Sequence, residues 1–201
     1  MTAGTCKKFF YAAVAHVALM LAALSPAMAA TAQWDVDQLM HTLAKAHAGQ
    51  ATFVEKKYVA VLERPVESSG ELSFTAPNRL EKKTLKPKPE TMLVDGDLLV
   101  IERGRQKHRL QLQDYPELAG FIDSIRGTLA GDRKALERTF RLTLTGDAQR
   151  WILTLAPHDA GVAQSVQQVR IAGSRDNVRS IDILQTDGDR SSMTIERVTP
   201  Q

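Results

Sequence analysis

The chain has 201 residues, a formal net charge of +3 at pH 7 and one cysteine. This length fits one ordinary domain with room for a sizeable core. A lone cysteine excludes an internal disulfide, and the nearly balanced charge gives no indication of nucleic acid as a partner.

Residues 1–30 have the three parts of a secretory signal peptide. Two lysines precede an apolar run at residues 9–24, and a small-residue cleavage motif follows. We expect cleavage near Ala29 or Ala30, which leaves a single domain at residues 31–201 in the periplasm. The two leader lysines account for two of the three net positive charges, so this domain is close to neutral.

The leader is not expected to anchor the protein. Its apolar run is too short for a convincing membrane span. Cys6 precedes that run, whereas the lipid-bearing cysteine of a bacterial lipoprotein follows it. We therefore expect a soluble mature protein without a thiol.

Residues 35–48 predict an N-terminal amphipathic helix, because their apolar residues recur at the spacing of one helical face. Beyond it, residues 53–102 alternate apolar and polar positions between turn signals. The pairs Asp95-Gly96 and Asp187-Gly188 predict tight hairpin turns in which both positions adopt positive φ. This pattern predicts an antiparallel meander with one apolar face.

A second helical region is predicted at residues 115–138, where Gly131 and Asp132 indicate a C-cap followed by a short helix. The late strands then repeat with period two, which again places apolar residues on one face of a sheet. Their apolar positions are Phe140, Leu142, Leu144, Trp151, Leu153, Leu155, Ile181, Ile183, Met193 and Ile195.

Motifs for chemistry are lacking in the sequence. It contains no phosphate-binding loop, dinucleotide fingerprint or HExxH motif. A hydrolase site could combine His108, His158 and Asp159 with Ser191 or Ser192, but no nucleophile-elbow sequence surrounds these serines. Single histidines on helices or in turns, here His41, His47 and His158, are usually solvated. We therefore predict no enzyme activity, no metal site and no cofactor.

Six lysines occupy two neighbouring segments of the predicted sheet: Lys56, Lys57, Lys82, Lys83, Lys86 and Lys88. They could form a docking patch for a partner. The favoured interpretation is that they are charges on edge strands, which oppose aggregation between sheets.

Four segments recur in the order and spacing of a known family. They are Phe53 with Glu55 (usually Gln in the family), GELSF at residues 70–74 leading into Pro77-Asn78, ETMLVDG at residues 90–96, and DGDRSS at residues 187–192. With these segments the chain resembles a divergent branch of the periplasmic outer-membrane lipoprotein carriers, the LolA family. The match covers nearly all of the mature chain.

The resemblance implies a mainly β (α+β) fold: an incomplete antiparallel β-barrel of about eleven strands, covered by a helical lid. On this mapping, the sheet residues that line the lipid-binding cavity are Phe74, Leu80, Met92, Val94, Phe140, Leu142, Trp151, Leu153, Ile183 and Met193. The lid residues are Leu39, Leu43, Leu118, Phe121, Ile122 and Ile125. Periodicity alone leaves open whether these residues fill a core or line a cavity.

The family shields the acyl chains of lipoproteins between an inner-membrane exporter and an outer-membrane acceptor. We therefore expect a monomeric carrier of an acylated lipoprotein or a related lipid. The alternative is a lipid-responsive sensor or scaffold that binds a partner protein. Sensors with this fold carry a further C-terminal domain, whereas this chain ends directly after its last predicted strand.

One position departs from the family. An arginine that fastens the lid precedes the Pro-Asn pair in the family, and Ala76 stands there in this chain. Arg79, three positions later, should face the opposite side of the strand. We therefore expect a lid that is less firmly fastened, or a different cargo.

Overall fold

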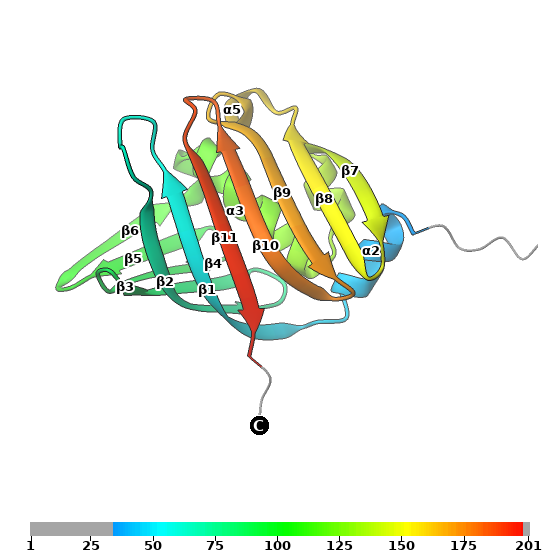
Figure 1. Ribbon diagram of the computed structural model, residues 1–201, viewed down its shortest axis with the longest axis horizontal. Coiled ribbons are helices and arrows are strands. Elements are labelled where there is room, and N and C mark those ends of the chain that lie inside the picture. Colours follow the sequence, from blue (N-terminus) through cyan, green and yellow to red (C-terminus); the bar gives the residue numbers. More distant parts are fainter. Residues whose placement is uncertain (1–33, 199–201) are drawn as a thin grey trace, which may run out of the picture. The chain divides into compact units, whose positions relative to one another are not determined.

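The computed structural model describes residues 34–198, and the predicted leader at residues 1–30 lies outside the described residues. Eleven strands form one sheet in the order β6-β5-β4-β3-β2-β1-β11-β10-β9-β8-β7 (Figure 1). All neighbouring strands are antiparallel. The predicted antiparallel meander is confirmed, and so is the number of about eleven strands that the family resemblance implied.

The strands are β1 (Ala48–Tyr58), β2 (Val66–Thr75), β3 (Arg79–Lys86), β4 (Glu90–Asp95), β5 (Leu98–Arg103), β6 (Gln106–Gln111), β7 (Phe140–Asp147), β8 (Arg150–Pro157), β9 (Val166–Ser174), β10 (Asn177–Gln185) and β11 (Arg190–Arg197). The helices are α2 (Val36–Leu43), the 3-10 helix η1 (Leu112–Asp114), α3 (Pro116–Ala130), α4 (Arg133–Glu137) and α5 (Ala160–Ala163). None of these helices is long and apolar enough to cross a membrane.

The first and last strands pair with each other, so Phe53 of β1 lies opposite Ile195 of β11. This pairing leaves β6 and β7 as the edges of the sheet. The segment that connects these two edges contains η1, α3 and α4, and the curved sheet holds α3 on its concave side (Figure 1). The fold is an incomplete β-barrel with a helical lid.

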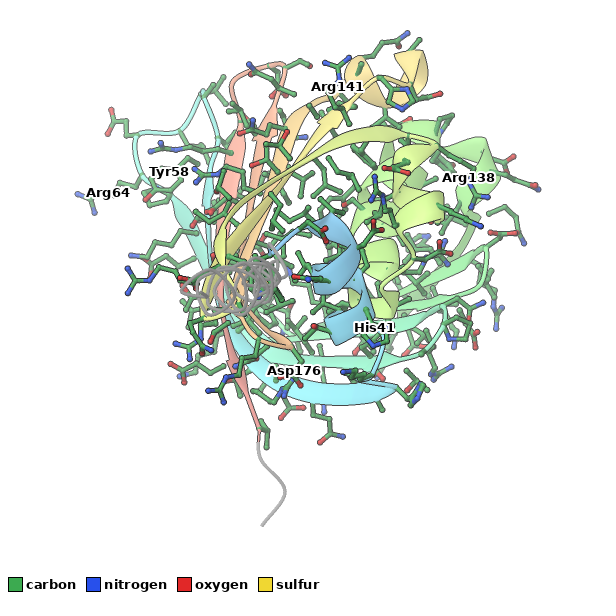
Figure 2. All side chains as sticks on the ribbon, turned by 90° about the vertical axis from the view of Figure 1, so that its right-hand side faces the viewer. His41, Tyr58, Arg64, Arg138, Arg141 and Asp176 are labelled. Atoms are coloured by element: carbon green, nitrogen blue, oxygen red, sulfur yellow. The ribbon has the colours of Figure 1, made fainter. Side chains whose placement is uncertain are left out.

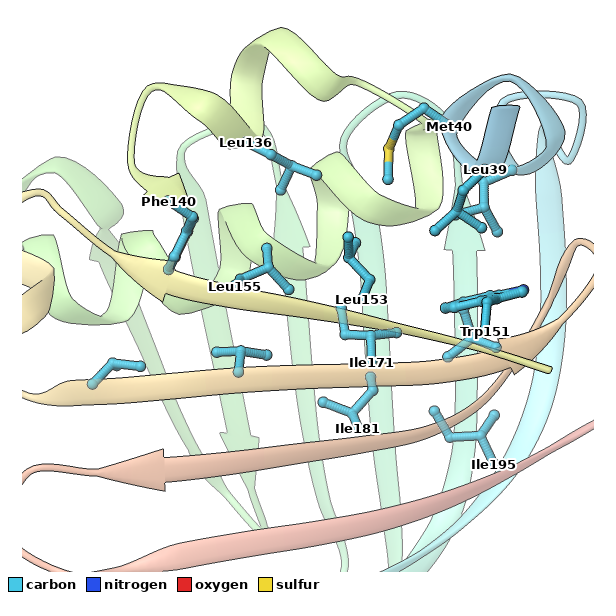
Figure 3. Close-up of a cluster of buried hydrophobic side chains, with 14 of the residues drawn as sticks. Leu39, Met40, Leu136, Phe140, Trp151, Leu153, Leu155, Ile171, Ile181 and Ile195 are labelled. Carbon is cyan, nitrogen blue, oxygen red and sulfur yellow. The ribbon is translucent and has the colours of Figure 1, made fainter. Parts of the chain in front are cut away.

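Apolar side chains from the concave face form two clusters with the helices. The larger cluster joins α2, α4 and α5 to β7–β11, and Figure 3 shows Leu39 of α2 and Leu136 of α4 facing strands β8 to β11. The smaller cluster joins Ile122 of α3 and Leu112 of η1 to Val94 and Leu99. The period-two pattern of the sequence therefore correctly predicted which face is apolar.

The N-terminal helix is shorter than predicted. Asp35 caps its start by accepting a hydrogen bond from the Gln38 backbone N–H at 2.9 Å, but α2 ends at Leu43 and not near residue 48. The reason is tertiary, because Ala48 already pairs with Thr75 of β2. Strand pairing thus replaces the last predicted helical turn.

The second helical region is confirmed, with α3 ending at Gly131 (φ 65°) and α4 following it. Its most buried positions are not the large apolar ones. Ser124 and Thr128 are fully buried, and Gly120 and Gly127 approach Val162 of α5 and Leu136 of α4. This small-residue face packs against other helices, which leaves the large apolar residues for the sheet.

The two predicted hairpin turns form, but only the glycine of each pair has positive φ. Gly96 (59°) and Gly188 (90°) occupy this region, whereas Asp95 and Asp187 do not. Asp95 instead belongs to β4 and pairs with Leu98, so the turn is centred on Gly96 and the following residue. Glycine at the first central position is typical of a type II′ turn.

The interpretation of the lysines as edge charges is wrong for the strands that carry most of them. β1 and β3 lie inside the sheet, and the edges are β6 and β7. Lys56 instead pairs with Glu67 at 3.1 Å and Lys83 with Glu71 at 3.9 Å, both on exposed positions. Adjacent strands therefore supply partners that the sequence pattern does not reveal.

We predict that Gly131→Ala destabilises the protein more than Gly104→Ala. Both glycines have positive φ, which costs other residues about 1–2 kcal/mol. A Cβ atom at Gly131 would also lie 2.2 Å from the Met40 carbonyl oxygen of α2, whereas Gly104 has nothing within 4 Å. Urea unfolding should give a loss of about 1 kcal/mol for Gly104→Ala and at least about twice that for Gly131→Ala. Equal losses would contradict the close packing of α2 on the end of α3.

Candidate functional site

The concave face brings together the sheet residues that the sequence indicated. Phe140, Trp151 and Leu153 are buried in the larger cluster, and Leu142, Ile183 and Met193 pack at its margin. Val94 belongs to the smaller cluster, with Leu80 and Met92 at its margin. Phe74 is also buried, at 8 % exposure.

The lid residues divide between the same two clusters. Leu39 and Leu43 of α2 are buried in the larger cluster. Along α3, Ile122 is buried in the smaller cluster, with Leu118 and Phe121 at its margin, while Ile125 packs against the larger one. Helix α3 therefore spans both apolar regions of the concave face.

Burial separates these candidates into two kinds. Trp151, Leu153, Leu39 and Leu43 are at most 1 % exposed. The Trp151 ring fills the space over Gly173, where an added Cβ would lie 2.3 Å from the ring, and its Nε1 donates to the Arg175 carbonyl at 2.9 Å. Such residues form a packed core.

The other candidates remain partly exposed on the concave face. They come from both the sheet and the lid, and they are Leu80, Met92, Leu142, Ile183, Met193, Leu118, Phe121 and Ile125. We name these eight residues the apolar lining.

Several core residues were not among the sequence candidates: Leu99, Leu112, Leu136, Leu155, Val162, Val169 and Ile171. The sequence had already placed Leu155 on the apolar face with Trp151 and Leu153, though not among the cavity residues. Val169 and Ile171 alternate in the same way along β9, so periodicity could have indicated them too. Leu112 and Leu136 lie in helices that are too short for a repeat of apolar residues to be recognised in the sequence.

A polar cluster interrupts the apolar concave face. Glu55 of β1 lies in register with Ser68 of β2 and Met193 of β11. Its carboxylate accepts hydrogen bonds from the Ser191 hydroxyl at 2.6 Å, from the Ser68 hydroxyl at 3.3 Å and from the Lys82 ammonium. The side chains of Glu55 and Lys82 are only 16 % and 27 % exposed.

The surroundings of Glu55 keep it ionised. Burial acts to raise its pKa, but the charge of Lys82 and the hydrogen bonds from Lys82, Ser191 and Ser68 together outweigh this effect and lower the pKa below its ordinary value of 4.5. The Lys82 ammonium also lies over the Phe53 ring, 4.9 Å from its centre. The pair is thus a fixed polar feature of the concave wall.

The lid contacts the sheet through a polar side chain as well. Arg126 of α3 donates to the Gly96 carbonyl in the β4–β5 turn and pairs with Asp123 on its own helix. Its side chain is 14 % exposed. Arg79 pairs with Asp95 at 2.9 Å, while its neighbour Leu80 packs at the smaller apolar cluster, so Arg79 faces away from the lid as expected.

A groove of about 410 Å³ lies on the opposite face of the sheet. By strand alternation, Gln168, Arg170, Asp182, Leu184, Arg190 and Ser192 point away from the apolar clusters, whereas Ile183 and Ser191, which also border the groove, belong to the concave face. It is lined mainly by polar and charged residues: Tyr58, Gln168, Arg170, Asp182, Ile183, Leu184, Arg190, Ser191 and Ser192. Figure 2 shows Tyr58 on the side of the molecule that carries the β1–β2 loop, beyond α2 and the lid. A polar lining is unsuited to acyl chains.

The possible hydrolase residues are not brought together. Asp159 caps α5 by accepting from the Gly161 and Val162 backbone N–H groups at 3.0 Å, and His158 lies 3.1 Å from the Glu137 carbonyl oxygen. Ser191 is on β11, separated from β8 by two strands. Neither serine is therefore beside this histidine.

The histidines considered as metal ligands are also apart. His41 and His47 are exposed on and just after α2, and His158 follows β8 (Figure 2 labels His41). Across residues 34–198, no three His, Cys, Asp or Glu side chains are grouped closely enough to hold a metal ion.

The structure is thus a sheet of eleven strands whose apolar concave side is covered by a helical lid. Residues 27–196 match the model of the family described as outer membrane lipoprotein carrier protein LolA-like. The chain belongs to this LolA-like family.

Individual relatives are distant. The outer-membrane lipoprotein carrier protein of Dechloromonas aromatica (strain RCB) is 24% identical over 163 residues, which cover 81% of this chain and 76% of the relative. Among solved structures, the LolA superfamily protein NE2245 of Nitrosomonas europaea has a TM-score of 0.43 and 10% identity over 84% of this chain and 95% of its own. A chain of the Pseudomonas aeruginosa MucA/MucB complex has a TM-score of 0.47 and 18% identity over 84% of this chain and 59% of its own.

We predict that Glu55 contributes to stability in a pH-dependent way. Because its pKa is lowered in the folded protein, its contribution is present above the ordinary value of 4.5 and is lost as pH falls through the lower folded pKa. The rise in unfolding free energy between pH 3 and pH 6, measured in urea, should therefore be smaller in Glu55→Gln than in the wild type.

Glu71→Gln is the matched control, because Glu71 and Lys83 form an exposed pair at 3.9 Å and exposed pairs contribute little. It should retain the pH dependence of the wild type. Parallel pH curves for Glu55→Gln and the wild type would show that the polar cluster does not stabilise the fold.

Proposed function

We propose that this protein is a periplasmic carrier that shields the acyl chains of a lipoprotein, or of a related acylated lipid. It would receive its cargo from an inner-membrane exporter and deliver it to an outer-membrane acceptor. The observation that carries the proposal is the apolar lining, in which eight partly exposed side chains from the sheet and α3 border two packed clusters. Membership of the LolA-like family supports the same function.

The distribution of burial fits a carrier better than a simple core. A domain that needs only stability gains by burying all of its large apolar residues, at roughly 25 cal/mol per Å² removed from water. Here the deep residues around Trp151 are buried, whereas Met193 at the margin of the same cluster keeps exposed surface, as do Met92 and Phe121 at the margin of the smaller cluster. Methionine adapts well to flexible chains, because its thioether side chain is unbranched and polarizable.

The energetic requirement is set by the cargo. Each methylene group exposed to water costs about 0.8 kcal/mol, so a long acyl chain faces a cost on the order of 10 kcal/mol outside a membrane. An apolar lining beneath a movable helix can lower that barrier. Because the sequence has no nucleotide-binding motif, transfer would follow differences in affinity between donor, carrier and acceptor.

Uptake would require α3 to move away from the concave face, since Leu118, Phe121 and Ile125 pack at the two clusters. The Arg126 contact with the Gly96 carbonyl fastens this helix to the β4–β5 turn. In this chain, an arginine on the lid would therefore take the place of the arginine on the strand that is missing at Ala76.

We predict that Phe121→Glu reduces lipid uptake more than tenfold while lowering the free energy of unfolding by less than about 2 kcal/mol. A carboxylate in the lining would meet the acyl chain, yet residue 121 is exposed enough to keep it hydrated. Uptake is measured with a fluorescent acyl lipid, and stability by urea unfolding. Val54→Glu is the control, because Val54 is 51 % exposed on the outer face of β1 and should change neither quantity.

Native mass spectrometry of protein purified from the periplasm without detergent tests the function itself. A bound acylated protein would support lipoprotein carriage, and a bound free lipid would support lipid carriage. Protein that stays empty after incubation with both kinds of cargo would contradict the proposal and favour a scaffold that binds a partner protein.

We predict that Arg126→Ala speeds hydrogen exchange in α3 and accelerates release of a bound lipid, with little change in the exchange of β8. The substitution removes the polar contact between the lid and the β4–β5 turn but leaves the packed cluster around Trp151 intact. Arg79→Ala is the matched control, since it removes an outward-facing pair from the same hairpin. Equal exchange in the two variants would show that Arg126 does not fasten the lid.

A further inference from the structure

Lys82 places an ammonium group on the concave face at a position flanked by apolar residues. In the strand register it lies between Leu72 of β2 and Met92 of β4. Its side chain does not leave this face but reaches across to Phe53 and Glu55 on β1. Gly70, which lies opposite Phe53 in register, has no side chain to obstruct this path.

Glu55 and Lys82 differ in how much of their hydrogen-bonding capacity is used within the protein. Glu55 accepts hydrogen bonds from three donors, on Ser68, Ser191 and Lys82. Within residues 34–198, the hydrogen-bond acceptor found for the Lys82 ammonium is the Glu55 carboxylate alone. An ammonium group has three N–H donors, and the Lys82 side chain as a whole is 27 % exposed. Lys82 therefore has donors left for a ligand, while Glu55 holds it in place.

The Lys82–Glu55 pair lies at a boundary between apolar and polar side chains on the concave face. Met92, opposite Lys82, and Met193, opposite Glu55, are both members of the apolar lining. At the same end of the concave face, strands β4 and β5 carry the charged pair of Glu90 and Arg103 in place of apolar residues. The wall thus passes from apolar to polar at the level of Lys82.

We propose that Lys82 binds an acceptor oxygen at the polar end of the cargo, where its acyl chains begin. This inference rests on the proposed carrier function and names the chemistry of the cargo that the site recognises. The acceptor is an ester carbonyl of a diacylglyceryl group or a phosphate oxygen of a phospholipid. Both accept a hydrogen bond from an ammonium group, and Glu55 positions Lys82 without contacting the cargo.

The test compares three probes on the full mature protein. Two carry the same acyl chains, a dipalmitoylglyceryl-cysteinyl peptide and dipalmitoylphosphatidylglycerol, and the third is N-phenylnaphthylamine, an apolar dye without an acceptor oxygen. Lys82→Met should weaken binding of the acylated probes about tenfold, the loss expected for one charge-assisted hydrogen bond, and leave dye binding unchanged. Lys83→Met is the matched control, because Lys83 is the next residue of the strand and faces the other side; it should bind all three probes as the wild type does.

Salt distinguishes the two sources of the acceptor. If the site takes a phosphate, the wild type should bind phosphatidylglycerol more weakly as ionic strength rises. If it takes an ester carbonyl, which both acylated probes carry, Lys82→Met should weaken the binding of both to the same extent, with little dependence on salt.

A second measurement needs no variant and therefore does not depend on the folding of Lys82→Met. Amine-reactive labelling of the wild type, read by mass spectrometry, should modify Lys82 several-fold more slowly when the lipopeptide or phospholipid is bound, and Lys83 at an unchanged rate. Unchanged labelling of Lys82, or full affinity in a folded Lys82→Met variant, would overturn the site while leaving the carrier function intact. A wild type that binds neither acylated probe would overturn both.

Discussion

The pairing of β1 with β11 is the contact on which the rest of the structure depends. It joins Ala51 to Arg197 and Tyr58 to Arg190, and so connects strands β2–β6 to strands β7–β10 in one sheet. The natural twist of strands curls a sheet of this width, which turns its apolar face inward. That face must be covered by something apolar. Of the helices that cover it, η1, α3 and α4 lie in the segment between the two edge strands, whereas α2 precedes β1 and α5 lies between β8 and β9. The barrel stays incomplete because helices, and not a further strand, span its open side.

The concave face has three physically different parts. Around Trp151 the side chains are fully buried, as in any core. The apolar lining retains exposed surface, a cost in stability that a purely structural core would avoid. The cluster of Glu55, Lys82 and two serines adds charge to the same wall. A half-buried ion pair is at best weakly stabilising against an apolar alternative, which is consistent with the role in cargo recognition that we propose for Lys82.

The lid is held by two kinds of contact with different consequences. The apolar contacts of α3 are spread over both clusters. They favour the closed position of the lid, but no single one of them controls its opening. The contact between Arg126 and the β4–β5 turn is a single directional hydrogen bond, so one local change can break it completely. Close backbone packing at Gly131 ties α2 to the end of α3. A movement of α3 should therefore also displace α2.

By itself, the sequence determined the strands, their inward faces and the cap at Gly131, because these follow from local periodicity and from the conformational freedom of glycine. It indicated the residues of the concave face for the same reason. It also placed Arg79 on the outer face correctly, since side chains alternate along any strand.

Only the tertiary structure decided which of those residues are packed and which remain partly exposed, because burial depends on where the helices lie. It also decided the end of α2, where pairing of Ala48 with β2 overrides helical periodicity. The lysines of β1 and β3 were misread for a related reason: strand order is a long-range property, and no local pattern distinguishes an edge strand from an inner one. The pairing of Glu55 with Lys82 and Ser191 joins residues 27 and 136 positions away in the chain, and it exists only because the register of a folded sheet brings them together.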